Sequence, residues 1–424
     1  MAVGFVALFL LLLNYPRTDG HLFSGDGAFY YGTLRSVILD HDLRIENELQ
    51  LINERIPKNS SSKGYGTEGA YAFSIGPAIL WSPFFLIGHE VALACHGLGM
   101  PVAVDGFSWI EESFVCIAGI LYGCVGLFLT FRLVNRWIDK QTALYAVIFV
   151  FGATSASYYV AIENWMSHAL QLFSLSIFFL FSQKERSEFG VKYFATTGFL
   201  LALVFLVRWQ DVLFGVVLLD PLSKLLRLDP ARRIRNVTIA ILSIGASFFA
   251  GASLQLVYWK SIFGSYITIP QGNDFIQFSH VHILEVLFST KHGLVTWTPI
   301  VLLGISGLFP ARDRRENTIL LIIALALQIF FCSAVADWWA GDAFGSRRLI
   351  NLFPILCIGF ARLLERTKHT SFHRFLMATS VCLVIWNGLF ILQYTLRLIP
   401  RSDFLTFQQL VTDKVTLPFQ WLKP

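Results

Sequence analysis

The chain has 424 residues, of which 55% are hydrophobic and 14% are charged, and its formal net charge is +5. A soluble domain carries about 25% charged residues. With a mean hydropathy of +0.60, an ordinary soluble globular protein is excluded. Apolar runs of roughly 18 residues or more recur along the chain, so we expect an all-α, polytopic bundle of transmembrane helices. Most Lys and Arg lie in short loops between these runs, so the positive charge indicates no nucleic-acid partner.

The first apolar run is the N-terminus itself, MAVGFVALFLLLLNY. It has no basic region before the apolar stretch and no small-residue cleavage site, so we interpret it as an uncleaved first helix rather than a signal peptide. The polar segment 16–69 follows and is expected to form a long first extracytoplasmic loop. Within this loop, residues 28–39 place apolar side chains at helical spacing, which predicts a short juxtamembrane helix on the membrane surface.

Three aspartates of this first loop are candidate functional residues. Asp26 and Ser24 precede the predicted short helix, so one interpretation is that Asp26 caps the helix N-terminus. The other interpretation is that Asp26 is an ionised carboxylate at the membrane boundary that acts as a general base. Asp40 and Asp42 are secondary carboxylates that either assist Asp26 or bind a divalent metal ion, although two carboxylates alone are a weak metal signature. No other cofactor is predicted.

The remaining apolar segments favour a single membrane domain, 1–424, with 11 to 13 spans and a polar tail, 397–424. They cover 71–98, 112–131, 142–160, 165–182, 193–222, 237–259, 293–309, 318–336, 349–364 and 375–396. The 71–98 run contains Gly-Pro and Ser-Pro and is expected either to re-enter the membrane or to span it twice. The 193–222 run lies between two basic loops, so it must cross and return. Two short or broken helices meeting at the polar sequence VRWQD would satisfy that constraint.

Three arginines stand where a positive charge is unexpected. Arg208 lies in the middle of an apolar run, where an isolated charge marks either function or a buried partner such as Asp211. Arg347 and Arg348 follow DWWAGDAFGS on a loop expected to be external, against the positive-inside trend, and are either solvated or functional. Further candidates for a cavity at this external side share polar or aromatic side chains near helix ends. They are Tyr30, His89, His168, His292, Trp338, Trp339 and Asp342.

Other catalytic signatures are absent from the sequence. The six cysteines lie in apolar segments without CxxC spacing, so they indicate neither a zinc site nor a disulfide framework. The chain has no Walker A loop, no HExxH and no GxSxG, which argues against an ATPase, a zinc protease and a serine hydrolase.

The arrangement of an apolar helix followed by an external loop with an acidic residue and aromatics resembles the GT-C superfamily of membrane glycosyltransferases. This superfamily includes protein O-mannosyltransferases and bacterial aminoarabinose transferases. Four further stretches are similar to its looser bacterial branch: GPAILWSPFFLIGH (76–89), LVFLVRWQDVLFGVVLL (203–219), KHGLVTWTPIVLL (291–303) and WWAGDAFGSRRLINLFPILCIGFARLL (338–364). One departure is that the family often has adjacent acidic residues in the first loop, whereas Asp26 stands alone between glycines.

This resemblance implies a glycosyltransferase in the bacterial inner membrane. It would move a sugar from a polyprenyl-phosphate donor to a lipid, glycan or protein acceptor at the extracytoplasmic face. Asp26 would be the general base, and Arg208, Arg347 and Arg348 would bind the donor phosphate. The alternatives are a transporter or flippase of lipid-linked glycans, an O-antigen ligase or polymerase, and a GT-C-like protein without catalysis. A transporter predicts internal repeats, and none is evident in the sequence.

Overall fold

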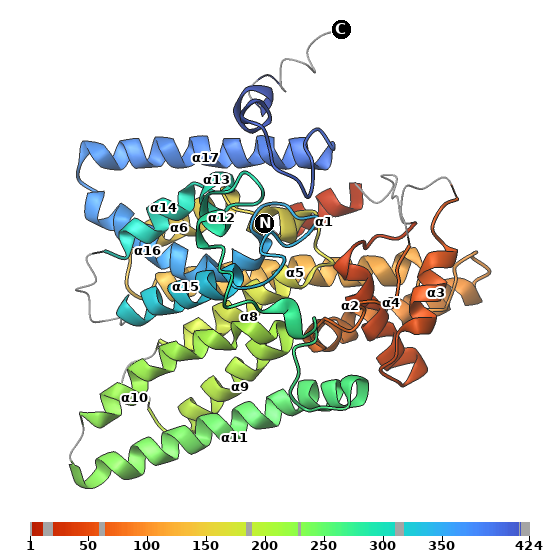
Figure 1. The fold of residues 1–424 in the computed structure, drawn as a ribbon, viewed down its shortest axis with the longest axis horizontal. Helices are drawn as coiled ribbons and strands as arrows, with labels where there is room; N and C mark the ends of the chain where they lie inside the picture. Colours follow the sequence, from red (N-terminus) through yellow and green to blue (C-terminus); the bar gives the residue numbers. More distant parts are fainter. Residues whose placement is uncertain are drawn as a thin grey trace.

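The structure is a computed structural model that describes residues 2–11, 20–58, 64–183, 189–227, 230–309, 318–414 and 416. Throughout these ranges the fold is helical and contains no strand, and one isolated β-bridge joins Ile276 to Val335. The helices pack side by side, with the first-loop helices at one end of the bundle (Figure 1). The expected all-α polytopic class is therefore confirmed.

The first loop forms short helices that carry Asp26. After α1 (Ala2–Leu11), the chain forms α2 (Asp26–Arg35), which continues as the π-helical η1 (Ser36–Asp40), and then α3 (Glu46–Glu54). The predicted short helix is confirmed, but it begins two residues earlier than expected. Its N-cap is Gly25, with φ at 57°, and Asp26 is its first residue. The interpretation of Asp26 as the cap is therefore wrong, because the carboxylate lies inside the first turn.

Four described helices are long and apolar enough to cross a membrane. They are α4 (Gly76–Gly97), α5 (Trp109–Val134), the segment Arg233–Phe263 of α11 (Pro230–Phe263) and α17 (Ser371–Thr395). The expectation that 71–98 re-enters or spans twice is wrong, because α4 is one continuous helix. Pro77 lies in its first turn, where the missing N–H is not needed, and Pro83 is accommodated inside the helix.

The other helices are shorter or broken. They are α6 (Lys140–Gly152), α7 (Ala156–Ala161), α8 (Ser167–Ser182), α9 (Val191–Val207), η3 (Trp209–Leu218), α10 (Leu219–Leu226), η4 (Asn273–Phe275), α12 (Ile283–Phe288), α13 (Leu294–Trp297), α14 (Ile300–Gly307), α15 (Thr318–Ser333), η5 (Arg347–Leu352), α16 (Phe353–Thr367) and η6 (Gln408–Thr412). The number of spans, 11 to 13, remains a prediction.

The predicted break in the 193–222 run is present at Arg208. This residue is extended, with φ at −150° and ψ at 108°, and it separates α9 from the 3₁₀ helix η3. A 3₁₀ helix rises about 2.0 Å per residue against about 1.5 Å in an α-helix, so η3 and α10 together return over roughly 32 Å, enough to match the roughly 26 Å of α9. Helix α9 packs against both η3 and α11. The 3₁₀ stretch thus lets a short run cross and return.

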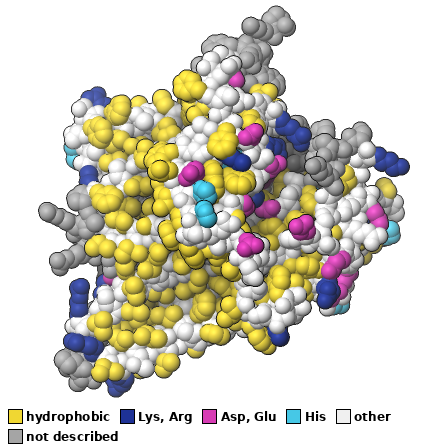
Figure 2. Space-filling view, viewed as in Figure 1, with side chains coloured by type: hydrophobic (Ala, Val, Ile, Leu, Met, Phe, Trp, Pro, Cys, Tyr) yellow, Lys and Arg dark blue, Asp and Glu magenta, His cyan; other side chains and the backbone are white. Residues whose placement is uncertain are grey.

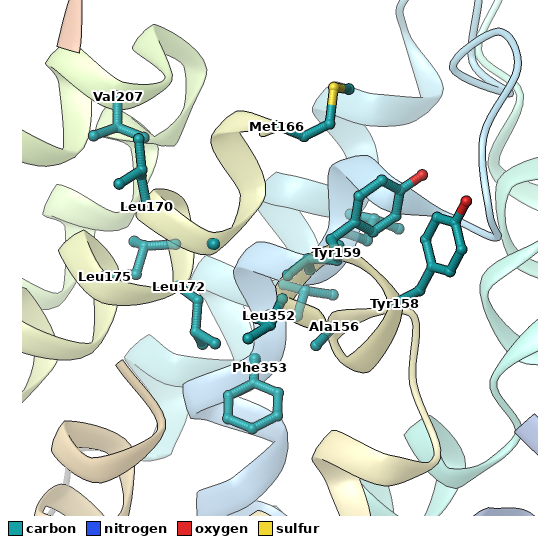
Figure 3. Close-up of a cluster of buried hydrophobic side chains, with 14 of the residues drawn as sticks. Ala156, Tyr158, Tyr159, Met166, Leu170, Leu172, Leu175, Val207, Leu352 and Phe353 are labelled. Carbon is teal, nitrogen blue, oxygen red and sulfur yellow. The ribbon is translucent and has the colours of Figure 1, made fainter. Parts of the chain in front are cut away.

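Helix α8 lies at the centre of the bundle. Its side chains Leu170, Leu172 and Leu175 are buried together with Tyr159 of α7 and Phe353 of α16 (Figure 3). A helix that is apolar around most of its circumference is a buried one. Because α8 is fixed in the core, the polar residues at its N-terminal end have defined positions.

The surface separates into an apolar region and a charged end. Figure 2 shows hydrophobic side chains across the helical part of one face, and Asp and Glu gathered on the side of the first-loop helices. Exposed apolar residues of α11 include Ile241, Leu242 and Phe249. Such a surface suits contact with lipid. Together with the long apolar helices, it identifies an integral membrane protein.

Candidate active site

A cavity of about 170 Å³ lies where α2, the α9–η3 break and η5 meet. Asp26, Arg208, Arg347 and Arg348 all line it. The rest of the lining comes from α2, the segment 72–74, the end of α9, η3, the loop 264–282, α15 and the loop after α15. It consists of Tyr30, Ala72, Phe73, Ser74, Val207, Trp209, Gln210, Gln271, Phe275, Phe331, Cys332, Val335 and Asp337.

Asp26 and Arg347 form an ion pair in this cavity. Asp26 Oδ2 lies 2.9 Å from Arg347 Nη2, and the two side chains are 34% and 14% exposed. Although burial disfavours the guanidinium charge, Asp26, Tyr159 and Glu163 outweigh it and raise the pKa of Arg347 above its ordinary value. The positive end of α2 also favours an anion in its first turn. The Asp26 carboxylate is thus held in place while remaining accessible from the cavity.

Arg208 is held by neutral partners. Its Nη1 donates to Ser167 Oγ at 3.2 Å, and the same hydroxyl accepts from the Tyr30 hydroxyl at 3.0 Å. With its amide oxygen turned toward Arg208, Gln210 accepts from Nη2 at 2.9 Å and from Nε at 3.0 Å. Burial raises the pKa of Tyr30, which keeps the hydroxyl protonated as a donor. Among the described residues, no carboxylate forms an ion pair with Arg208, so its charge is available to a ligand.

Arg348 is already neutralised by Asp337. Its Nη2 donates to both carboxylate oxygens of Asp337, at 2.8 and 2.7 Å, and its Nη1 donates to the Asp337 carbonyl at 2.6 Å. The guanidinium also lies 5.7 Å from the centre of the Phe275 ring. A bidentate pair of this kind fixes the orientation of both side chains. Arg348 therefore forms a rigid part of the cavity wall, and its charge is balanced by the Asp337 carboxylate.

The loop 264–282 closes one side of the cavity. Gln271 Nε2 donates to the Ala72 carbonyl at 2.8 Å. The Phe275 carbonyl accepts from Ala336 N at 2.8 Å, and Gln277 N donates to the Ala334 carbonyl at 2.6 Å. Aromatic rings from this loop, from η3 and from α15 also line the cavity. The arrangement combines a polar floor with apolar walls, which suits a ligand that has an anionic group next to a sugar or a lipid chain.

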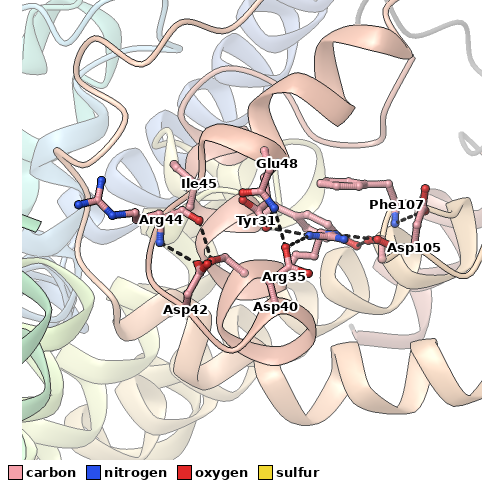
Figure 4. Close-up of polar contacts among 12 residues, drawn as sticks. Tyr31, Arg35, Asp40, Asp42, Arg44, Ile45, Glu48, Asp105 and Phe107 are labelled. Atoms are coloured by element: carbon pink, nitrogen blue, oxygen red, sulfur yellow. Dashed lines mark hydrogen bonds and ion pairs between the residues drawn. The ribbon is translucent and has the colours of Figure 1, made fainter. Parts of the chain in front are cut away.

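The secondary carboxylates do not line the cavity, so the expectation that they assist Asp26 is not supported by their position. Asp40 lies 14 residues after Asp26 on the same continuous helix, roughly 20 Å away along its axis. It accepts from Arg35 Nη1 at 2.6 Å and from Asn47 Nδ2 at 2.7 Å. Asp42 accepts from Ser36 Oγ at 2.6 Å (Figure 4). Among the described residues, no group of three or more His, Cys, Asp or Glu is arranged to hold a metal ion.

The network around Asp40 instead attaches the first loop to the segment before α5. Arg35 Nε donates to the Asp105 carbonyl at 2.7 Å, and Arg35 Nη1 donates to Glu48 Oε1 at 2.8 Å. Arg55 forms an ion pair with the Asp105 carboxylate. These contacts hold α2 and α3 against the end of the bundle (Figure 4). Their role is to position α2, and with it Asp26.

Three predicted cavity histidines lie outside the lining. His89 Nδ1 is 2.6 Å from Glu111 Oε1, which connects α4 to α5. His168 is buried behind the cavity, 3.3 Å from Gln171 Oε1 through its Nδ1, with its ring against Tyr159. His292 Nδ1 is 2.7 Å from the carbonyl of Trp339, and burial lowers the pKa of His292, which favours a neutral ring. Each makes packing or hydrogen-bond contacts away from the cavity.

Trp338, Trp339 and Asp342 also lie outside the lining. The two indoles contact one another edge to face, with centroids 5.7 Å apart. Lys291 Nζ lies 4.0 Å from the centre of the Trp339 ring, a cation–π contact. Asp342 is exposed. A sugar-stacking role for the two tryptophans therefore has no support from their position in this structure.

Sequence reasoning missed several residues that line or support the cavity. Asp337 comes directly before Trp338, and its partner Arg348 is 11 positions further on, so no local spacing signals the pair. Gln271 and Phe275 come from a polar loop without any periodic pattern. Ser167 follows the sequence ENWM (163–166) at the start of α8, and a hydroxyl at the start of an apolar run is only a weak signal.

No protein-family model matches the sequence, and no curated protein matches it. Solved structures do match. ArnT from Cupriavidus metallidurans bound to undecaprenyl phosphate is 14% identical over 99% of this chain and 75% of ArnT, with a TM-score of 0.51. The apo state of the same ArnT is 14% identical over 93% of this chain and 71% of ArnT, with a TM-score of 0.49.

The apo oligosaccharyltransferase of Archaeoglobus fulgidus is 12% identical over 99% of this chain, with a TM-score of 0.41, and the chain spans 54% of its length. At these identities the likeness concerns the fold alone. The chain therefore shares the fold of ArnT, which agrees with the expected architecture of packed membrane helices.

Proposed function

We propose that this protein is a glycosyltransferase that moves a sugar from a polyprenyl-phosphate donor to a hydroxyl-bearing lipid, glycan or protein acceptor. The observation that carries the proposal is that Asp26, Arg347 and Arg208 line one cavity in a GT-C fold. The ArnT structure that shares this fold binds undecaprenyl phosphate. We place the reaction at the extracytoplasmic face of a bacterial inner membrane, because Asp26 lies on the first loop, which is expected outside from the positive-inside rule.

Asp26 has the properties required of the base. The acceptor hydroxyl must lose its proton as the oxygen attacks the anomeric carbon, so a carboxylate must lie within hydrogen-bond reach. Asp26 is paired on one side with Arg347 and is one-third exposed, so an acceptor can approach it. Arg347 holds the carboxylate oriented toward the cavity. The proton moves from the acceptor hydroxyl to Asp26, and the anomeric carbon–oxygen bond to the phosphate breaks.

Arg208 has the properties required to receive the leaving group. A lipid phosphate that departs from the sugar carries a developing negative charge, and a preoriented cation stabilises that charge most where water is excluded. Arg208 is held by Ser167 and Gln210 and has no carboxylate competitor among the described ion pairs. Its planar guanidinium binds phosphate oxygens in pairs. The aromatic walls would contact the sugar and the first part of the lipid chain.

The test is transfer by the purified protein. Membranes that lack or overproduce the protein are screened with radiolabelled polyprenyl-phosphate sugars to find the donor, and the purified protein is then assayed with it. Asp26→Asn should reduce turnover by roughly 100- to 10,000-fold, the range for loss of a general base. Asp274→Asn is the matched control, because Asp274 lies on the loop 264–282 but does not line the cavity.

The outcome separates the rival functions. If Asp26→Asn transfers sugar at the wild-type rate, the base assignment is wrong. If the wild-type protein binds polyprenyl phosphate but transfers nothing from any donor, a catalytically inactive GT-C-like protein is favoured. If it moves lipid-linked glycans between the leaflets of a vesicle without cleaving them, the transporter alternative is correct.

A further inference from the structure

A layer of buried polar side chains lies directly behind the cavity. It consists of Gln171 of α8, Asp211 of η3, Gln328 of α15 and Asn351 of η5, and we call these four residues the buried polar layer. Each is at most 1% exposed. Gln171 Nε2 donates to one oxygen of Asp211 at 2.6 Å, and Asn351 Nδ2 donates to the other at 2.8 Å. Asn351 Nδ2 also donates to Gln328 Oε1 at 3.0 Å, so the contacts connect all four elements.

Cavity residues lie close to the layer along the chain. Arg208 directly precedes η3 and lies three residues before Asp211, and Asp211 N donates to the Arg208 carbonyl at 2.9 Å. In η5, Arg348 precedes Asn351 by three residues. Three residues make one turn of a 3₁₀ helix, so Arg348 and Asn351 share a face of η5.

In the two α-helices, α8 and α15, the corresponding residues are four positions apart. In α8, Ser167, which bonds Arg208, precedes Gln171 by four residues. In α15, Cys332 lines the cavity and follows Gln328 by four residues. Residues four apart lie above one another on an α-helix. The residues of the cavity region and those of the buried polar layer are thus close neighbours along the same segments of the chain.

We propose that the buried polar layer is the device that positions Arg208 for the donor phosphate, an inference that rests on the proposed function. Asp211 accepts hydrogen bonds from α8 and η5 at once, so it fixes η3 relative to both elements. Asp211 lies three residues after Arg208, so its negative charge also attracts the guanidinium. Arg208 is extended between α9 and η3, so a regular helix does not set the direction of its side chain.

The cost of the layer argues against a role in stability alone. Burying an amide without a full set of partners is unfavourable, and apolar side chains of similar shape would fill the same space at no such cost. Asn351 Oδ1 and Gln328 Nε2 are buried and have no hydrogen-bond partner among the described residues. The arrangement is therefore retained at the expense of stability, as expected for a device that holds functional groups in place.

The test replaces the layer with apolar side chains of similar size. The fourfold variant Gln171→Met, Asp211→Leu, Gln328→Met, Asn351→Leu should keep a melting temperature close to wild type. Its affinity for undecaprenyl phosphate in detergent should fall about tenfold. Arg208→Ala, which weakens binding in the wild type, should cause little further loss in the fourfold variant. Gln393→Met is the control, because Gln393 is a buried amide of α17 that donates to the Gln409 carbonyl outside the layer and the cavity, and it should leave the affinity unchanged.

A second measurement needs no substrate. The rate at which phenylglyoxal labels Arg208, read by mass spectrometry, should rise several-fold in the fourfold variant and stay at the wild-type value in Gln393→Met. If the fourfold variant does not fold, the isosteric Asp211→Asn is measured instead and should shift binding and labelling in the same direction. This change replaces one accepting oxygen with an NH₂ group, so a donor faces one of the amide donors of Gln171 and Asn351.

The inference is overturned if a folded variant labels Arg208 at the wild-type rate, or if Arg208→Ala costs the same affinity in both backgrounds. If instead the proposed function is wrong, the wild-type protein will neither bind undecaprenyl phosphate nor transfer sugar. The labelling experiment would still decide whether the layer positions Arg208.

Discussion

The Asp26 carboxylate lies 2.9 Å from the Arg347 guanidinium, although the two residues belong to the first and the last loops that reach the cavity. The pair places a negative and a positive group side by side, so the carboxylate is oriented before any substrate binds. Preorganisation of this kind removes the cost of arranging charges during the reaction. The contact therefore connects the first-loop helix to the chemistry expected in the cavity.

Arg347→Ala should reduce turnover by roughly 10- to 100-fold, because the Asp26 carboxylate loses the group that orients it. Arg347→Lys should recover part of the rate, since a point charge replaces one contact of the planar guanidinium. The measurement is kcat with saturating donor and acceptor. Equal kcat for the alanine variant and the wild type would show that the pair has no role in orienting the base.

Arg208 and Arg348 should differ although both line the cavity. Arg208→Ala should raise the KM for the donor roughly 10- to 100-fold, because it removes a charged hydrogen-bonding group without a carboxylate partner. Arg348→Ala leaves the Asp337 carboxylate unpaired near the phosphate, so it should weaken donor binding by repulsion. The double variant Arg348→Ala, Asp337→Ala should bind the donor better than Arg348→Ala alone. If it binds equally poorly or worse, Arg348 contacts the phosphate directly.

Local patterns in the sequence predicted the parts of this protein that depend on neighbouring residues. Apolar run lengths indicated the membrane fold, the spacing within 28–39 indicated α2, and the charge of Arg208 inside an apolar run indicated the broken helix. The interpretation of Asp26 as the helix cap was wrong because Gly25, with its positive φ, occupies the N-cap position of α2. A single helix over 76–97 was missed because prolines that end soluble helices are accommodated in this one.

Contacts between distant segments decided the rest of the site. Asp40 appeared close to Asp26 in sequence, but the continuous helix from α2 into η1 separates the two carboxylates. Asp337 and Gln271 enter the cavity only because the loop 264–282 pairs with residues 333–336. The three predicted histidines are polar residues near helix ends, as expected for a cavity, but their hydrogen-bond partners lie on α5, within α8 and in the loop after α15.

The stability of the first loop should depend on pH through Glu48. Burial, reinforced by the neighbouring Asp40, raises the pKa of Glu48 to about 7, and Arg35 opposes this shift only in part. The folded state therefore favours the protonated acid more than the unfolded state does. This contribution is complete below the ordinary pKa of about 4.5 and is lost as the pH rises through about 7.

Glu48→Gln removes this titration and should flatten the fall of the melting temperature between pH 5 and pH 7.5, a range set by the same pKa shift. Thermal melts in detergent across that range check the prediction. Glu54→Gln is the control, because Glu54 lies on the same helix α3 and is exposed. An unchanged slope in Glu48→Gln would assign the pH dependence to another group.

Gly76 should be the most sensitive glycine near the site. A Cβ at this position would collide with the carbonyl of Leu206 and lie 2.6 Å from the backbone nitrogen of Val207, directly before Arg208. Neither backbone group can move without shifting the α9–η3 break. Gly76→Ala should therefore destabilise the protein by about 1–3 kcal/mol. It should also weaken donor binding, because Arg208 is displaced with the break.

Gly97→Ala provides the comparison within the same helix. A Cβ at Gly97 meets no atom within 4 Å, so this change should be neutral or stabilise by up to about 1 kcal/mol through helix propensity. Melting temperatures and the KM for the donor are measured for both variants. If Gly76→Ala melts and binds donor like Gly97→Ala, the close packing of α4 against the break does not hold Arg208 in the cavity, and the position of Arg208 must then depend on Ser167, Gln210 and the buried polar layer.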